Sequence, residues 1–401
     1  MHPNNISAEL KAVCSQSPRS ISVMGSTGSI GTNTIDLIAR NPDLFRVEAL
    51  TANRNVDLLA KQAIALNAKM AVVADPESYE SLKNTLAGTG IEVAAGPEGL
   101  LEAAERPSDL VMAAIVGFAG LAPTLAAIKR GATLLLANKE ALVCAGDLMM
   151  AAAQQSKARI LPVDSEHNAI FQVFDFERKS GIEHITLTAS GGPFRLFSQD
   201  QMKHVTREEA LAHPNWVMGE KISVDSASMM NKGLELIEAA YLFGLPENQI
   251  KVLIHPQSII HSMVSYVDGS VLAQLGSPDM RTPIAYALAW PERIKTPVAP
   301  LDLARIGQLT FEEPDPERFP ALDLARIALN EHKTVIFNAA NEVAVEAFLS
   351  EKINFISIAR FVAEAMGSFP GLEEASLVEI MDLDKEVRYW CYEALKTYLV
   401  N

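Results

Sequence analysis

Residues 21–31 read ISVMGSTGSIG, an apolar run that ends in a turn containing Gly25, Gly28 and Gly31. The apolar run predicts a strand, and residues 34–40, which follow the turn, have helical periodicity. A strand, a glycine turn and a helix N-terminus in this order bring backbone N–H groups and the positive end of a helix dipole to a pyrophosphate. The spacing is G-x-x-G-x-x-G and not G-x-G-x-x-G, so the motif needs support from its context.

Strand-like and helix-like segments alternate outward from this turn. The later expected strands of the first part of the chain are 46–52, 69–74, 110–115, 133–137 and 159–163. This alternation predicts an α/β fold with a Rossmann-like, doubly wound parallel sheet. Because ligands bind beyond the carboxyl ends of such strands, ANKE at 137–140 and DSEH at 164–167 are expected to face the same crevice as the glycine turn.

The end of the second expected strand bears on the choice of cofactor. Asn53, Arg54 and Asn55 stand where an NAD enzyme usually carries an acid for the ribose 2′-hydroxyl. None of the three is acidic, and the guanidinium of Arg54 suits a 2′-phosphate. The cofactor is therefore predicted to be NADPH.

Three carboxylates form a candidate metal site. Asp164 and Glu166 follow an apolar run, and on an extended backbone two side chains at this spacing project from one face. Glu235 is the candidate third ligand, on a predicted helix at 229–242 that also carries Asn231 four residues earlier. Three monodentate carboxylates leave about three positions open on an octahedral, oxygen-loving ion, which suits Mg²⁺ or Mn²⁺.

Other polar groups suit an anionic substrate. Ser190, Ser226, Asn231 and Lys232 together offer hydroxyls, an amide and an ammonium for a phosphate. The segment HPNWVMG at 213–219 combines a titratable ring, a large aromatic side chain and a glycine, and it is interpreted as a lid.

Taken singly, these residues also have structural interpretations. Asp164 and Glu166 suit a solvated turn, Glu235 an exposed helix face and Trp216 a core anchor. For three histidines the sequence allows either a role beside the metal and substrate site or a structural role: His167, His255 and His261. The structural role is favoured for His255, because buried polar groups usually serve hydrogen bonding.

Composition narrows the function classes. The chain has 401 residues, 49% of them hydrophobic, which suffices for two or three cores. Its three cysteines form no C-x-x-C pair, so a disulfide framework is not expected. The chain is expected in a reducing compartment, the cytoplasm. The net charge of −15 argues against a nucleic-acid or anionic-membrane partner, and the one long uncharged run, 111–128, is broken by Gly and Pro.

The pattern along the chain predicts five segments. In order, they are a flexible extension (1–18), an NADPH-binding Rossmann domain (19–163), an α+β catalytic domain that binds metal and substrate (164–290), a proline-rich linker (291–320) and a C-terminal helical bundle (321–401).

The motifs GSTGSIG, ANKE, DSEH, SGGPF, HPNW.MG.KISVDSA.MMNKGLE and HPQSIIHSMV occur in the order found in the 1-deoxy-D-xylulose 5-phosphate reductoisomerase family. From about residue 20 to its end the chain resembles this family. The resemblance implies a homodimeric oxidoreductase that uses NADPH and a divalent metal. It would isomerise 1-deoxy-D-xylulose 5-phosphate and reduce the resulting aldehyde to 2-C-methyl-D-erythritol 4-phosphate, in non-mevalonate isoprenoid biosynthesis.

The resemblance also implies roles for individual residues. NADPH would contact Thr27, Gly28, Ser29, Ile30, Asn53, Arg54, Asn55, Asn138, Glu140 and Gly219. The metal would be held by Asp164, Glu166 and Glu235. The sugar phosphate would be bound by Lys139, Ser165, Glu166, Ser190, His213, Ser226, Asn231, Lys232 and Glu235. The catalytic set would be Lys139, His213 and the three metal ligands. The chain departs from the family pattern at Asn53, where glycine is usual, and at Glu220, where a basic residue is common.

Two rival functions come from other classes. A plain NADP-dependent sugar-phosphate dehydrogenase would not need the three carboxylates, and a nucleotide-sensing module would not need the phosphate pocket. Fold analogy alone separates neither from a reductoisomerase.

Overall fold

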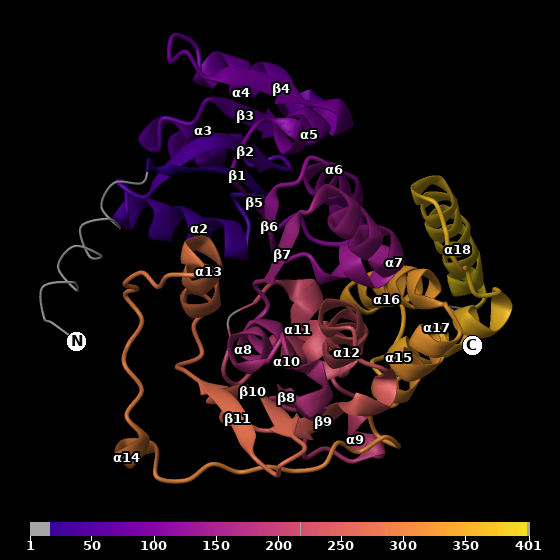
Figure 1. Cartoon of the computed structure of the whole chain (residues 1–401). Helices are drawn as coiled ribbons and strands as arrows, with labels where there is room; N and C mark the ends of the chain where they lie inside the picture. Colours follow the sequence, from indigo (N-terminus) through magenta and orange to yellow (C-terminus); the bar gives the residue numbers. More distant parts are fainter. Residues whose placement is uncertain (1–16, 217, 399–401) are drawn as a thin grey trace, which may run out of the picture. The chain divides into compact units, whose positions relative to one another are not determined.

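The computed structural model describes residues 17–216 and 218–398 and contains two compact units (Figure 1). The first ends at Ala114 and the second begins at Ile115. Residues 1–16 of the expected extension lie outside the described residues. The finer domain boundaries expected from the sequence stay predictions.

The first unit contains a parallel sheet with helices. Its strands have the order β4-β3-β2-β1-β5, and every neighbouring pair is parallel. The strands are β1 (Arg19–Met24), β2 (Phe45–Ala52), β3 (Met70–Val73), β4 (Glu92–Ala95) and β5 (Leu110–Ala113). The connecting helices are α2 (Ser29–Arg40), α3 (Val56–Ala65), the short η2 (Pro76–Ser78), α4 (Tyr79–Thr85) and α5 (Gly96–Glu105). The strand–helix alternation seen in the sequence is therefore a parallel α/β arrangement.

The glycine turn joins β1 to α2 and depends on a close backbone approach. Gly25 has a φ of +87°, a value that L side chains rarely adopt. A Cβ on Gly31 would lie 2.2 Å from the carbonyl oxygen of Gly25, so a side chain there would collide with backbone. Helix α2 begins at Ser29, five residues before the expected start, which places Gly28 at its N-cap.

The first strands of the second unit are β6 (Thr133–Leu136) and β7 (Arg159–Pro162), which pair in parallel with each other. Each strand leads into a helix that starts close to its carboxyl end. The helices of this region are η3 (Phe118–Gly120), α6 (Leu121–Lys129), α7 (Lys139–Ser156) and α8 (Ser165–Val173). Candidate site residues therefore stand at the N-termini of α7 and α8.

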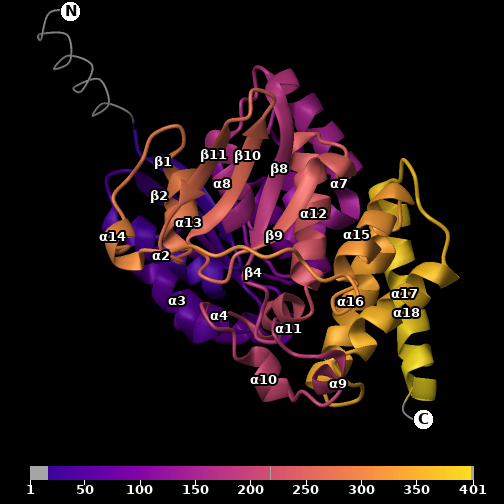
Figure 2. The same cartoon turned by 90° about the horizontal axis from the view of Figure 1, so that it is seen from below.

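A second sheet, of order β11-β10-β8-β9, follows in the same unit (Figure 2). Strand β10 is antiparallel to both of its neighbours, whereas β8 and β9 are parallel. The strands are β8 (Ile182–Ala189), β9 (Ile250–Ile254), β10 (Ile260–Tyr266) and β11 (Val271–Leu275). Between or beside them lie η4 (Lys179–Gly181), α9 (Gln199–Met202), α10 (Arg207–Leu211), α11 (Glu220–Ala227), α12 (Met230–Phe243), η5 (Glu247–Gln249) and α13 (Arg281–Ala289). Helices α8 and α12 pack on this sheet.

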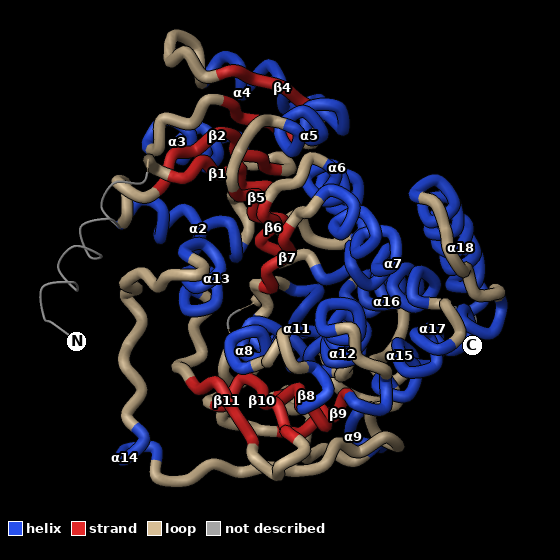
Figure 3. Tube along the Cα trace, in the orientation of Figure 1, coloured by secondary structure: helices blue, strands red, loops and turns tan. Residues whose placement is uncertain are grey.

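The chain then crosses a long loop to a group of helices (Figure 3). The loop contains only the short α14 (Leu303–Ile306) and a bridge between Glu312 and Ile254 of β9. The helices after it are α15 (Ala321–Asn330), α16 (Thr334–Leu349), α17 (Ser357–Ser368) and α18 (Leu377–Tyr398). A Cβ on Gly233 would lie 3.1 Å from the carbonyl oxygen of Ala321, so this glycine lets α12 pack closely against α15.

These observations confirm the expected fold class: a Rossmann-like parallel sheet, an α+β region and C-terminal helices. The sequence did not single out β4, β10 or β11. Among residues 17–216 and 218–398, no helix is both long enough and apolar enough to cross a bilayer.

We expect Gly31→Ala to lower the free energy of unfolding by about 1–3 kcal/mol, because the added methyl group collides with the backbone of the turn. Gly28→Ala is the matched control, since its Cβ would lie 3.6 Å from the same carbonyl oxygen, an ordinary contact. Urea unfolding of both variants measures the difference. Equal stabilities would show that the close approach at Gly31 does not constrain the turn.

Candidate functional site

Two helix N-termini in the second unit carry most of the candidate site. Asn138 is the N-cap of α7: its side chain accepts a hydrogen bond from the Ala141 backbone N–H at 3.1 Å and donates one to the Gly117 carbonyl at 3.0 Å. Lys139 is thereby fixed as the first residue of the helix. Asp164 occupies the N-cap position of α8, with an extended ψ of 136°.

The expected extended backbone at Asp164 and Glu166 is wrong. Strand β7 ends at Pro162, and α8 begins at Ser165, so Glu166 lies in the first turn of a helix. The two carboxylates nevertheless come together, because a side chain at the N-cap and one in the first turn both lie at the helix N-terminus. The helix dipole favours negative charge at this position.

Asp164, Glu166 and Glu235 each place a carboxylate oxygen within 4.8 Å of the other two. Glu235 reaches this cluster from α12 and is fully buried. The Lys139 ammonium contacts Asp164 and lies 3.3 Å from Glu235 Oε1 and 2.8 Å from Asn231 Oδ1. The buried cluster therefore contains both carboxylates and ammonium groups.

A second ammonium enters the cluster from α12. Lys232 Nζ lies 2.7 Å from Glu166 Oε1 and contacts the other carboxylate oxygen of Glu235. Asn231 donates a side-chain hydrogen bond to Glu235, and the Ser165 hydroxyl donates one to Glu166 at 2.6 Å. Three carboxylates and two ammonium groups leave one negative charge in excess.

The pKa values of the cluster reflect this crowding of charge. Burial, followed by the negative charge of Glu166, raises the pKa of Glu235 to about 7. Burial acts to raise the pKa of Asp164 as well, but the Lys139 ammonium lowers it overall. Burial opposes the charged form of Lys232, and its two carboxylate partners, Glu166 first, outweigh that effect and raise its pKa. Burial opposes the charged form of Lys139 too, but Asp164 and Glu235 outweigh it and raise its pKa, so both ammonium groups keep their charge.

This donor set fits a hard divalent cation. Three carboxylates that converge on one point and carry excess negative charge are the oxygen ligands that Mg²⁺ and Mn²⁺ prefer. The raised pKa of Glu235 supports the fit, because a nearby cation would relieve the repulsion that disfavours its ionised form.

A tight turn after β8 stands beside α11. Gly191 and Gly192 have φ values of +82° and +66°, and a Cβ on Gly192 would lie 2.9 Å from the carbonyl oxygen of Ser226. The Ser190 hydroxyl lies 2.8 Å from His213 Nε2 and accepts a hydrogen bond from the Gly192 N–H at 3.2 Å. Ser190, Ser226 and His213 are thus brought into one neighbourhood.

The expected lid, 213–219, joins α10 to α11, and its residue 217 lies outside the described residues. His213 Nδ1 accepts hydrogen bonds from the backbone N–H groups of Asn215 and Trp216. The Trp216 ring is partly exposed and lies 6.3 Å from the His261 ring. Gly219 has an ordinary φ of −66°, so this conformation does not use the freedom of a glycine hinge. Closure of the segment stays a prediction.

Two of the open histidines have structural partners. His255 Nδ1 lies 2.9 Å from the Thr310 carbonyl oxygen, its Nε2 accepts from the Ile259 N–H, and its ring stacks on Phe311. This geometry favours the structural role expected for His255. His167 is buried behind the carboxylates, with Nε2 2.9 Å from the Glu235 carbonyl oxygen and Nδ1 3.0 Å from Glu238.

The sequence predicted no role for Lys221, which lies within the motif HPNW.MG.KISVDSA. The Lys221 ammonium lies 2.8 Å from both Glu140 Oε1 and Asp225 Oδ2, and Asp225 in turn accepts a hydrogen bond from Asn341 of α16. These contacts tie α7 and α16 to α11. The i, i+4 spacing of Lys221 and Asp225 on a helix was the only available signal. The neighbouring Glu220, a departure from the family pattern, pairs with Arg207 at 2.6 Å.

The predicted cofactor contacts of the first unit surround two strand ends. None of them is buried: Thr27, Gly28, Ser29, Ile30, Asn53, Arg54 and Asn55. The Asn55 side chain accepts a hydrogen bond from the Leu58 N–H and caps α3. Asn53 is not among the residues with positive φ, so its backbone does not require the glycine usual at this position. The turn is accessible to solvent and leads into a helix N-terminus, an arrangement that fits a dinucleotide phosphate.

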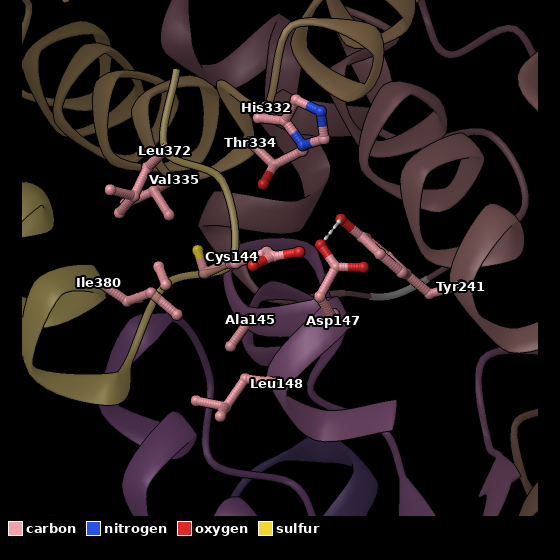
Figure 4. A pocket seen from close by; sticks show the side chains of 13 residues that line it. Cys144, Ala145, Asp147, Leu148, Tyr241, His332, Thr334, Val335, Leu372 and Ile380 are labelled. Carbon is pink, nitrogen blue, oxygen red and sulfur yellow. Dashed lines mark hydrogen bonds between the residues drawn. The ribbon is translucent and has the colours of Figure 1, made fainter. Parts of the chain in front are cut away.

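A small pocket lies elsewhere in the second unit, beside a kink of α7 at Ala145 (Figure 4). Gly146 packs under the Tyr241 ring, where a Cβ would come within 2.3 Å. The Tyr241 hydroxyl points toward Asp147, at 3.5 Å. With a volume of about 30 Å³ the pocket holds one or two waters, so it is too small for a sugar phosphate.

Comparisons with known proteins agree on one family. Three family models match the chain. The model of 1-deoxy-D-xylulose 5-phosphate reductoisomerase matches residues 21–146, that of the 1-deoxy-D-xylulose 5-phosphate reductoisomerase C-terminal domain matches 160–243, and that of the DXP reductoisomerase C-terminal domain matches 275–390. A relative of that name from Rhodospirillum centenum is 59% identical over 377 residues, which cover 94% of each chain.

Solved structures give the same result. The reductoisomerase of Zymomonas mobilis in complex with NADPH is 51% identical, with a TM-score of 0.90 over 95% of this chain and 99% of that one. A DOX-P reductoisomerase in complex with NADPH, fosmidomycin and magnesium is 46% identical, with a TM-score of 0.90 over 94% of this chain and 98% of that one.

Proposed function

The chain belongs to the 1-deoxy-D-xylulose 5-phosphate reductoisomerase family, and we propose that the residues described above carry out the reaction of that family. The reaction isomerises 1-deoxy-D-xylulose 5-phosphate and reduces the product to 2-C-methyl-D-erythritol 4-phosphate. The observation that carries the proposal is the buried group of three carboxylates with two ammonium side chains. A plain dehydrogenase or a nucleotide sensor has no use for such a costly arrangement.

Asp164, Glu166 and Glu235 are the proposed metal ligands. A bound Mg²⁺ or Mn²⁺ supplies Lewis-acid polarisation of the substrate oxygens, and NADPH supplies a hydride. The ammonium of Lys139 already contacts Asp164, Asn231 and Glu235, which occupies its three N–H groups. It would hold the carboxylates in position, and it would donate to a substrate hydroxyl by exchanging one of these partners.

The proposed phosphate pocket lies between α12 and the turn after β8. Ser190, Ser226, Asn231, Lys232 and His213 supply hydroxyls, an amide, an ammonium and an imidazole. Burial, only partly offset by Glu166, lowers the pKa of His213, which favours the neutral ring near pH 7. Because Nδ1 accepts from backbone N–H groups, Nε2 carries the proton and can donate a hydrogen bond. Binding energy from the phosphate, remote from the reacting carbons, can be used to orient the substrate.

The proposed NADPH contacts comprise the glycine turn, the segment after β2, and three positions of the second unit: Asn138, Glu140 and Gly219. The Glu140 carboxylate is paired with the Lys221 ammonium through Oε1, and it has further acceptor positions for an N–H or O–H group of the cofactor. Arg54 is the proposed partner of the 2′-phosphate.

We expect Glu235→Gln to abolish turnover and to weaken Mn²⁺ binding at least about tenfold, because a neutral amide replaces one of three charged ligands. Mn²⁺ binding is measured by electron paramagnetic resonance, and NADPH binding, which should be retained, by fluorescence. Glu238→Gln is the matched comparison: Glu238 is buried on the same helix and, with Asp164 and His167, forms a second group close enough to hold a metal. A loss of Mn²⁺ affinity confined to Glu238→Gln would assign the ion to that second group. Wild-type Mn²⁺ affinity in Glu235→Gln would refute the ligand assignment.

We expect Arg54→Ala to weaken NADPH binding and not to weaken NADH binding. A hydrogen bond to a charged group contributes about 1.5–3 kcal/mol, so the preference for NADPH should fall roughly ten- to a hundredfold. Titration of each cofactor against the substrate-free protein measures the ratio. If the ratio were unchanged, Arg54 would not be the 2′-phosphate partner.

The family resemblance implies a homodimer, and one surface of the second unit suits a second copy of the chain. The edge strand β11 exposes Val271, Leu272 and Leu275, with exposed fractions of 54%, 48% and 36%, and Val267 before it is 68% exposed. Val271 and Leu272 are neighbours and so point to opposite faces of the sheet. An apolar edge strand is an aggregation hazard unless it is covered. We propose that a partner subunit covers it.

This proposal predicts a mass of twice 43.4 kDa in solution, measured by sedimentation equilibrium. Leu272→Glu should shift the chain toward monomer, because a carboxylate would be buried at the contact. Leu44→Glu, at a leucine of similar exposure in the first unit, is the control and should remain dimeric. A monomeric wild type, or equal masses for the two variants, would contradict the assignment.

We also propose a cytoplasmic location, because Cys144 and Cys391 are buried free thiols, which suits a reducing compartment. Subcellular fractionation tests this location, and recovery of the chain from an oxidising compartment would exclude it.

A further inference from the structure

The carboxyl ends of β2 and β3 lie side by side in the first unit. The two strands pair in parallel up to Ala52 and Val73. The ladder then continues, because the Ala74 N–H donates to the Ala52 carbonyl at 2.8 Å and the Asp75 N–H donates to the Asn53 carbonyl at 3.2 Å. Asp75 therefore stands next to the segment that is proposed to bind the adenosine end of NADPH.

The Asp75 carboxylate is held in place by the chain around it. It accepts a hydrogen bond from the Glu77 backbone N–H at 3.1 Å and one from the Ser78 hydroxyl at 3.4 Å, and so caps the short helix η2. The same carboxylate lies 3.0 Å from Nε of Arg54. Its side chain is 15% exposed, whereas that of Arg54 is 76% exposed. The Asp75 carboxylate is thus fixed in place, and it is paired with the mostly solvated guanidinium of Arg54.

A carboxylate near the end of β2 has a known chemical consequence in folds of this kind. It accepts hydrogen bonds from a free ribose 2′-hydroxyl and repels a 2′-phosphate. Here the acid comes from the neighbouring strand end, and Arg54 neutralises it. The Arg54 contact uses Nε, and the guanidinium has further N–H groups that can bind a phosphate.

We propose that Asp75 is a specificity-determining residue whose charge Arg54 masks. Arg54 then acts twice: it attracts the 2′-phosphate, and it cancels an acid that would otherwise favour NADH. The inference rests on the proposed binding of NADPH at this strand end. It predicts that loss of Arg54 uncovers Asp75, so that part of the lost NADPH preference comes from repulsion and not from a missing hydrogen bond.

A double-mutant cycle tests the proposal. The wild type, Arg54→Ala, Asp75→Asn and the double variant are titrated with NADPH and with NADH in the absence of substrate and metal. Arg54→Ala should lower the ratio of the two affinities, and Asp75→Asn in that background should restore it by about three- to tenfold, the size expected for one screened charge at short range. The restoration should shrink at about 1 M salt, where the Debye length is about 3 Å.

The matched control is Asp36→Asn in the Arg54→Ala background. Asp36 lies two turns into α2 and forms a similar ion pair, 2.9 Å from Nε of Arg40. Asp36→Asn changes the net charge by the same amount as Asp75→Asn. It should leave the ratio unchanged. Asp75→Asn should retain the cap of η2, because an amide oxygen also accepts from the Glu77 N–H. If its thermal midpoint falls, Asp75→Ser, another capping residue, replaces it in the cycle.

The outcomes separate the two levels of the argument. An unchanged ratio in Arg54→Ala would overturn the proposed 2′-phosphate contact itself. A lowered ratio that the double variant does not restore, or a restoration that is insensitive to salt or equal in the Asp36→Asn control, would leave that contact intact and overturn the masking role of Asp75.

Discussion

The buried charges around Glu235 constrain the second unit more than any other interaction. Glu235 is fully out of contact with water, and each charged group near it lies within hydrogen-bonding distance of an opposite charge. Removing either ammonium from such a group leaves buried carboxylates uncompensated, which costs several kcal/mol. The N-termini of α7 and α8 and the first turns of α12 must therefore be specified together. This requirement explains why ANKE, DSEH and NKGLE occur as a set in a single chain.

Much of the fold could be predicted because buried strands leave a strong local signal. The strand expected at 46–52 is β2 (Phe45–Ala52), and its residues are nearly all buried. Two of the strands that the sequence did not single out, β4 and β11, lack such a signal for identifiable reasons, whereas the internal strand β10 has several buried residues. Strand β4 (Glu92–Ala95) has no buried residue, and β11 (Val271–Leu275) is an exposed sheet edge. Edge strands show neither a continuous apolar run nor a clear alternation.

For the site, residue types were more informative than backbone geometry. Asp164 and Glu166 were identified on an extended backbone, yet they meet at a helix N-terminus, because two carboxylates can converge in either conformation. Glu235 lies about seventy residues away, and no local spacing determines such a pairing. Lys221 was missed for the same reason. It contacts Glu140 of α7, and Asp225, its other partner, accepts a hydrogen bond from Asn341 of α16, so the whole set forms only after α7, α11 and α16 have packed together.

The net charge of −15 makes local electrostatics decisive for a chain that must bind anions. Charges separated by more than a Debye length, about 8 Å at physiological salt, hardly influence each other in solvent, so the overall negative charge does not exclude an anionic ligand. A buried ammonium is screened much less. Lys139 and Lys232 are both buried and keep their charge, because carboxylates raise the pKa of each above its usual value. The carboxylates that suit a cation therefore also keep two cations charged inside an acidic protein, within reach of an anionic substrate.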